Sequence, residues 1–261
     1  MKTLLICHED SALDREVIPG WLASFSDLVG MVVLKEPKSR RVQRIRREIR
    51  RSGLLRFLDV VAFRLYYRLR LAGKDGAWED AVRRELARRY PEPGETVPVV
   101  VTESPNSREA ERLISDVSPD VVIARCRTLL EERIFSLAST GTFVLHPGIT
   151  PEYRNSHGCF WALANRDLDR VGMTLLRIDA GVDTGPVYGY YTYDYDERRE
   201  SHVVIQKRMV LENLDAVRDK LLEVHRGQAV PIDTTGRESG AWGQPWLTKY
   251  LRWKLAARKA Q

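Results

Sequence analysis

Short, nearly unbroken apolar runs recur along this chain, and longer segments interrupted by polar residues separate them. Four such runs occur, at residues 2–7, 97–101, 120–124 and 142–146. Strands with one face in water alternate apolar and polar positions, whereas continuous runs of this length are typical of strands buried on both faces. The pattern therefore predicts a parallel sheet with helices on both sides.

Segments with helical spacing lie between these runs, for example residues 107–115 and 129–139. Strand and helix in alternation favour a doubly wound α/β fold with a mainly parallel, Rossmann-like sheet. In such sheets ligands bind beyond the carboxyl ends of the strands. His146 ends the last of the four runs, so a site is expected there.

The span from about residue 40 to 90 is longer than one crossover connection needs, and its apolar residues have helical spacing. We expect an inserted pair of helices there. Residues 187–196 alternate partly and include five tyrosines, which predicts a strand or hairpin arm. Residues 201–225 carry an apolar stripe that predicts one amphipathic helix.

These elements predict an α/β domain over residues 1–196, with the insertion at about 40–90, and a mainly helical extension over 197–261. The end of the chain carries Trp242, Trp246 and Trp253, three of its six tryptophans, among basic residues. This composition suits a membrane-surface helix, but packing onto the domain or onto a second subunit is the favoured interpretation. A homodimer is therefore left open.

A formal charge of +6 is concentrated between Lys35 and Arg51, where nine Lys/Arg face two Glu. The run predicts a basic amphipathic helix that either binds nucleic acid, an anionic membrane or a phosphorylated substrate, or is simply a solvated face. No aromatic residue interrupts it, which argues against nucleic acid held by base stacking.

The three cysteines are widely spaced, so they indicate neither a disulfide framework nor a zinc site, and no metal is expected. No apolar stretch approaches the length of a transmembrane helix, and no charged-then-apolar leader opens the chain. We expect a cytoplasmic protein.

The candidate chemistry lies in two loops rich in Pro and Gly, residues 146–154 and 181–186. They offer a histidine, His146, and a carboxylate, Asp183, which are a plausible proton-handling pair. These loops, with Trp161-Ala162 and Gly172-Met173-Thr174 between them, resemble the signature of the formyltransferase family that uses 10-formyltetrahydrofolate. The resemblance covers about residues 118–190.

The resemblance implies a role for each matching residue. His146 would polarise the formyl oxygen, and Asp183 would accept the proton that the attacking amine loses. Tyr153 and Arg154 would line the acceptor side. Backbone groups of two segments would hold the folate, namely Arg127, Thr128, Leu129 and Leu130 together with Asp179, Ala180, Gly181 and Val182.

Val144 departs from the family pattern, because the family has an asparagine there that hydrogen-bonds the formyl oxygen. Losing one such donor typically costs roughly 10²–10³ in rate. Asn155 or His157 could replace it if their loop folds back toward His146. Alternatively, Asn155 merely takes the left-handed turn conformation that glycine would otherwise occupy.

Two further departures bear on the acceptor. Glu9 and Asp10 follow the first strand where members acting on glycinamide ribotide carry a phosphate cradle, and carboxylates repel phosphate. The tRNA-directed members carry a further β-barrel domain that the residues after Tyr190 do not supply, so initiator tRNA is not the expected substrate.

We therefore expect an N-formyltransferase that acts on a small amine, either a nucleotide-linked amino sugar or an amine of specialised metabolism. Arginines of the insertion could bind the diphosphate of a nucleotide-linked sugar. Two alternatives stay open. One is a hydrolase that releases formate from the folate with water as acceptor. The other is a non-catalytic or repurposed relative, which Val144 supports.

Overall fold

The computed structural model describes residues 1–37, 48–50, 53–94 and 96–259. Most of the basic segment 35–51 therefore lies outside the described residues. A seven-stranded sheet with the order β3-β2-β1-β4-β5-β7-β8 forms the centre. Its strands are β1 (Lys2–His8), β2 (Asp27–Leu34), β3 (Val99–Thr102), β4 (Val121–Arg125), β5 (Gly141–His146), β7 (Met173–Arg177) and β8 (Val187–Tyr191).

The strands from β3 to β5 are parallel, whereas β7 and β8 are antiparallel to their neighbours. The predicted mainly parallel, doubly wound α/β sheet is thus confirmed. Parallel strands end at the same edge, so β1, β4 and β5 deliver His8, Arg125 and His146 side by side.

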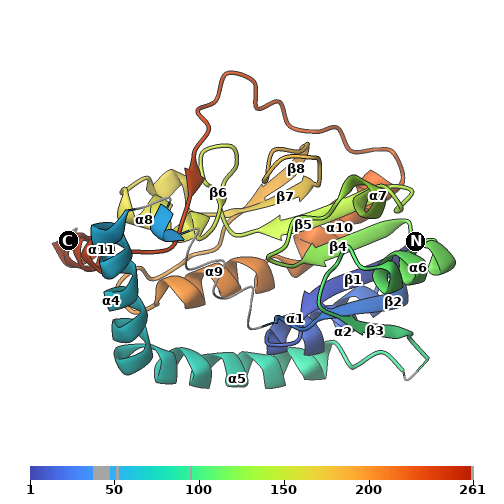
Figure 1. Ribbon diagram of the computed structural model, residues 1–261, viewed down its shortest axis with the longest axis horizontal. Coiled ribbons are helices and arrows are strands. Elements are labelled where there is room, and N and C mark those ends of the chain that lie inside the picture. The colour runs from blue at the N-terminus through green and yellow to red at the C-terminus, as the bar shows by residue number, and fades with distance from the viewer. Residues whose placement is uncertain (38–47, 51–52, 95, 260–261) are drawn as a thin grey trace.

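Helices cover both faces of the sheet, which explains the continuous apolar runs (Figure 1). On one face, α6 (Arg108–Val117) and α7 (Glu132–Phe135) pack against Leu4, Ile6 and Val122. The other face forms the larger apolar cluster. It is covered by α1 (Ala12–Glu16), α2 (Ile18–Ala23), α8 (Gly158–Ala164), α9 (His202–Leu211) and α10 (Leu214–His225).

The helical pair expected at about 40–90 is present. It consists of α4 (Leu54–Arg70) and α5 (Ala72–Arg89), which run along two edges of the molecule in Figure 1. The last helix, α11 (Leu247–Lys259), lies beside α4 and α8 and buries Tyr250 and Trp253. The Trp-rich end therefore packs back onto the rest of the chain.

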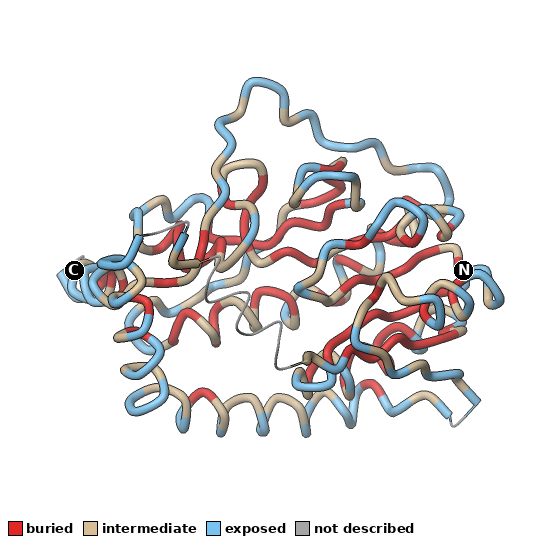
Figure 2. Tube along the Cα trace, in the orientation of Figure 1, coloured by how far each residue is buried: buried red, intermediate tan, exposed pale blue. Residues whose placement is uncertain are grey.

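An exposed segment, residues 226–240, crosses the top of the molecule in Figure 2. It leads into β9 (Ala241–Trp242), which pairs with β6 (Arg154–Asn155). A short 3₁₀ helix, η1 (Leu168–Arg170), precedes β7. None of the helices in the described part of the chain is long and apolar enough to cross a bilayer.

Three sequence predictions need correction. Strand β2 was missed, although residues 28–34 are as apolar as the other runs. The helix expected at 129–139 is only Glu132–Phe135. The single helix expected at 201–225 is broken at Asn213, whose side chain donates to the carbonyls of Thr192 and Met209 and so competes with the helical backbone.

Candidate active site

His146, at the end of β5, is 4% exposed and is held by the loop that follows it. Its Nε2 lies 2.8 Å from the carbonyl oxygen of Tyr153. A carbonyl only accepts hydrogen bonds, so Nε2 carries a proton. Nδ1 is left to face the pocket side, and it bears a proton only when the ring is an imidazolium.

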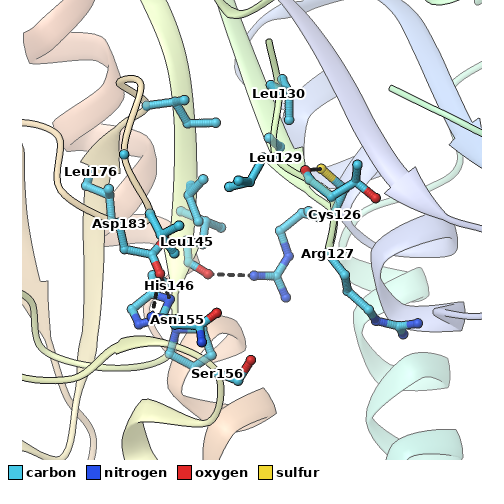
Figure 3. A pocket seen from close by; sticks show the side chains of 18 of the residues that line it. Cys126, Arg127, Leu129, Leu130, Leu145, His146, Asn155, Ser156, Leu176 and Asp183 are labelled. Carbon is cyan, nitrogen blue, oxygen red and sulfur yellow. Dashed lines mark hydrogen bonds and ion pairs between the residues drawn. The ribbon is translucent and has the colours of Figure 1, made fainter. Parts of the chain in front are cut away.

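Asp183 supplies the carboxylate opposite Nδ1, with Oδ2 at 3.5 Å (Figure 3). The residue has a left-handed backbone, φ 51°, which aims its side chain at His146. Its loop is tied by Asp179, whose Oδ1 accepts from the Gly181 amide at 2.9 Å and from the Thr184 hydroxyl at 2.7 Å. The pair suggested by sequence is therefore brought together by two separate loops.

Asn155 takes part through its backbone rather than its side chain. Its amide N–H donates to Asp183 Oδ2 at 2.7 Å, and its φ of 74° is left-handed. Its side-chain Nδ2 donates to the Trp242 carbonyl at 2.6 Å. The turn interpretation of Asn155 fits this geometry, because its side-chain donor is directed at β9.

Three other candidates do not line the pocket. Tyr153 is buried, donates to Asp167 and stacks on Trp242. Arg154 donates to the carbonyl of Val182 at 2.8 Å, so it fixes the Asp183 loop from behind.

His157, the third of these residues, does not line the pocket either. Its ring lies near Gln206 and His202. Burial lowers the pKa of His157 to about 4, so it is neutral at pH 7. In this geometry the side chains of Tyr153, Arg154 and His157 hold the loop and do not line the pocket, and their direct contact with the acceptor stays a prediction.

A pocket of about 410 Å³ opens at this edge of the sheet. It is lined by every residue of the two expected folate segments, namely Arg127, Thr128, Leu129, Leu130, Asp179, Ala180, Gly181 and Val182. His146, Asp183 and Asn155 line the same space, as does Val144. The proton-handling pair and both segments therefore share one cavity, whose volume suits a small-molecule ligand.

The loop after β1 repels anions less than its two carboxylates, Glu9 and Asp10, suggest. Glu9 lies 3.4 Å from Lys35, and Asp10 is bonded to both terminal nitrogens of Arg127. Partial burial opposes ionisation of Asp10, but the Arg127 hydrogen bond and charge outweigh it and lower the pKa of this carboxyl. Both carboxylates are thus partly neutralised by neighbouring cations.

Arg125 and Asp14 belong to the pocket although sequence reasoning passed over them. Arg125 ends β4, and its Nε donates to Asp14 Oδ1 at 2.8 Å. The signal was a charged residue that ends a buried strand beside the one carrying His146. Within the described residues, no group of three or more His, Cys, Asp or Glu could hold a metal ion.

Comparison with known proteins shows what the chain as a whole is similar to. No protein-family model matches the chain. Methionyl-tRNA formyltransferase of Thermotoga sp. (strain RQ2) is 30% identical over 131 residues, which cover 47% of this chain and 41% of that protein. Over this stretch the chain is similar to the formyltransferases. It spans less than half the length of the curated relatives it matches.

Solved formyltransferase structures share the fold of this chain. A sugar N-formyltransferase from Shewanella sp. FDAARGOS_354 superposes with a TM-score of 0.55 over 98% of this chain and 88% of that one, at 12% identity. Glycinamide ribonucleotide transformylase 1 from Symbiobacterium toebii gives 0.54 over 90% and 91%, at 13% identity. The Rossmann-like formyltransferase fold is thus confirmed.

Proposed function

We propose that this protein transfers the formyl group of 10-formyltetrahydrofolate to a small amine, with a nucleotide-linked amino sugar as the first acceptor to test. The observation that carries the proposal is the shared cavity, in which His146 and Asp183 face the two segments expected to hold the folate. A sugar N-formyltransferase is among the proteins that share its fold, which supports the same class of acceptor.

The cavity fits the folate by its lining. Leu129 is 62% exposed at the pocket, and Leu130, Leu176 and Ile178 add apolar wall for a flat ring. The backbone of Arg127–Leu130 and Asp179–Val182 would hold its polar edge. When bound there, the folate supplies an activated formyl carbon to the attacking amine.

The residues of this chain then divide the proton chemistry. As the amine nitrogen bonds to the formyl carbon, its proton passes to Asp183, directly or through a water. The carbonyl oxygen gains negative charge, which the imidazolium form of His146 stabilises at close range. When the bond from carbon to the folate nitrogen breaks, the proton held at Asp183 is available for that nitrogen.

Incubation with 10-formyltetrahydrofolate and separate acceptors tests the proposal. The panel is nucleotide-linked amino sugars, free amino sugars and initiator methionyl-tRNA, and mass spectrometry follows the gain of CO on the acceptor. Transfer to a small amine is expected. Formate release without any acceptor would identify a hydrolase, transfer to tRNA alone would replace the small-amine proposal, and folate binding without either reaction would indicate a repurposed relative.

A further inference from the structure

The developing oxyanion needs a hydrogen-bond donor, and the donors around His146 are already engaged. His146 Nε2 is bonded to the Tyr153 carbonyl, and Nδ1 faces Asp183. The Asn155 amide N–H is bonded to Asp183, and its side-chain Nδ2 donates to Trp242. Val144, whose side chain offers no donor, lines the same cavity.

The Arg125 side chain lines this cavity and has more N–H groups than its two hydrogen bonds use. A guanidinium carries five N–H groups. Nε donates to Asp14, and Nη1 donates to the Leu145 carbonyl at 2.7 Å, the hydrogen bond that ends at Leu145 in Figure 3. None of the described residues accepts a hydrogen bond from Nη2. The side chain is 18% exposed and lines the pocket.

These two anchors hold the guanidinium in place before any ligand binds. Leu145 directly precedes His146, so the bond from Nη1 places Arg125 at the same strand end as the reacting pair. The Asp14 carboxylate, 15% exposed, neutralises the charge at Nε but leaves the Nη2 edge unengaged. A fixed donor in a partly closed site needs little rearrangement when charge develops.

Resting on the proposed function, we propose that Arg125 donates from its free Nη edge to the formyl oxygen and so stabilises the oxyanion. The assignment gives Val144 a place in the same site, because a neighbouring cationic donor removes the need for a polar side chain there. Arg125 is then a catalytic residue that contacts the reacting carbonyl, and Asp14 is a positioning residue.

The experiment combines kinetics with a probe of the bound carbonyl. Arg125→Gln is expected to lower kcat by roughly 10²–10³ while the KM for the folate changes little. Arg125→Gln with Asp14→Asn removes both charges, so that no carboxylate is left unpaired, and it should show the same loss in a folded protein. Arg89→Gln, which breaks an exposed pair with Asp215 outside the pocket, should leave kcat unchanged.

Val144→Asn should recover at least tenfold in kcat in the Arg125→Gln protein and change the wild type much less, because the two positions would serve the same oxygen. Equal effects in both backgrounds would overturn the proposal. If the wild type transfers formyl, two further results would overturn the proposal. One is an unchanged kcat in Arg125→Gln, and the other is an effect of Arg125→Gln on the acceptor KM alone.

A stable 10-formyl folate analogue labelled with ¹³C in the formyl group gives a readout that does not need turnover. The formyl resonance of the bound analogue should shift in the wild type and lose that shift in Arg125→Gln. An identical resonance in both proteins would overturn the role of Arg125. Failure of the wild type to bind the analogue would instead overturn the proposed function itself.

A separate observation concerns the outer face of α4. Six aliphatic side chains on this helix are more than 40% exposed, namely Leu54, Leu55, Leu58, Val61, Leu65 and Leu69. At about 100° per residue they fall, with Ala62, on one stripe opposite the buried Val60 and Phe63. Monomeric proteins rarely expose apolar patches of more than a few hundred Å², so this stripe is expected to be covered.

The stripe is symmetric about the midpoint between Val61 and Ala62. Leu58 and Leu65 lie equally far from that midpoint, as do Leu54 and Leu69. A twofold axis there would run two copies of α4 antiparallel and place Leu58 of each against Leu65 of the other. A self-complementary patch is what a twofold interface requires, and we infer that a second copy of this chain covers it.

Analytical ultracentrifugation of the full chain over a range of concentrations tests the dimer. Leu58→Glu with Leu65→Glu should shift the dissociation constant at least a hundredfold toward monomer. Val230→Glu, at a site 84% exposed outside α4, should not. A wild type that stays monomeric throughout would overturn the inference, and so would stripe-dependent binding of the monomer to anionic vesicles.

Cysteine cross-linking tests the register. Val61→Cys lies next to the proposed axis and should form a disulfide-linked dimer on oxidation. The two copies of Leu54→Cys would lie at opposite ends of the helix pair and should not form a disulfide. Efficient cross-linking at both positions would indicate parallel helices and contradict the proposed symmetry.

Discussion

Gly148 and Gly158 touch behind the His146 ring, so closely that a Cβ on Gly158 would lie 2.5 Å from the Gly148 Cα. A Cβ on Gly148 would lie 2.5 Å from the Tyr153 carbonyl oxygen and 2.8 Å from His146 Nε2. That carbonyl is the acceptor which holds His146. The contact between two glycines thus sets the position of the histidine ring.

Gly148→Ala is expected to destabilise the protein by about 1–3 kcal/mol, as overpacking of a closed site does, and to lower activity more than stability accounts for. Thermal unfolding and turnover measure the two effects. Gly73→Ala is the matched control, because nothing lies within 4 Å of its Cβ in α5. It should stabilise the helix by about 0.5–1 kcal/mol, and equal behaviour of the two variants would contradict the role of the contact.

Asp183→Asn keeps the shape of the side chain but removes the charge opposite His146 Nδ1. We expect kcat to fall by roughly 10²–10⁴, the usual range for a lost general base, with folate affinity nearly unchanged. Asp233→Asn, an exposed carboxylate outside the pocket, should be neutral. Wild-type turnover in Asp183→Asn would remove this carboxylate from the chemistry.

Arg154→Met removes two hydrogen bonds, one to the Val182 carbonyl and one to Ser239. Since Val182 belongs to the expected folate segment, we expect folate to bind roughly five- to tenfold more weakly, which is the effect of about 1 kcal/mol. Calorimetric titration measures it. Ser239→Ala removes only the hydrogen bond to Ser239 and should weaken folate binding less than Arg154→Met does. If Ser239→Ala weakened folate binding more, the loss of affinity would come from the 226–240 segment and not from Val182.

Acid is expected to destabilise the packing between α8 and α9. Burial lowers the pKa of His157 to about 4, and burial with the nearby charges of His157 and Lys254 lowers that of His202 well below 6.5. Below pH 6.5 the unfolded chain therefore binds protons that the folded chain does not. The free energy of unfolding should fall by up to about 1.4 kcal/mol per pH unit for each histidine between about pH 6.5 and 4.

His202→Phe tests this dependence, because His202 lies among Phe63, Phe160 and Tyr250 and a ring of that shape can replace it. Denaturant unfolding at several pH values should show a smaller slope over the same window. A slope equal to that of the wild type would mean that other groups cause the acid sensitivity.

Local sequence determined the elements that need only short-range information. Apolar runs identified β1, β3, β4 and β5, and helical spacing identified α4, α5 and α6. The motif also identified His146 and Asp183, because a histidine that ends a buried strand and a carboxylate in a Gly-bracketed turn are local patterns. The division of the chain at residue 196 and the catalytic roles stay predictions.

Only the tertiary structure decided what the neighbouring side chains do. Tyr153 turns inward onto Trp242, and His157 onto Gln206, because segments more than 40 residues away supply their partners. Arg125 joins the site because parallel pairing sets the end of β4 beside that of β5. Local patterns along the chain do not reveal such pairings, since they arise when strands distant in sequence end at one edge of a sheet.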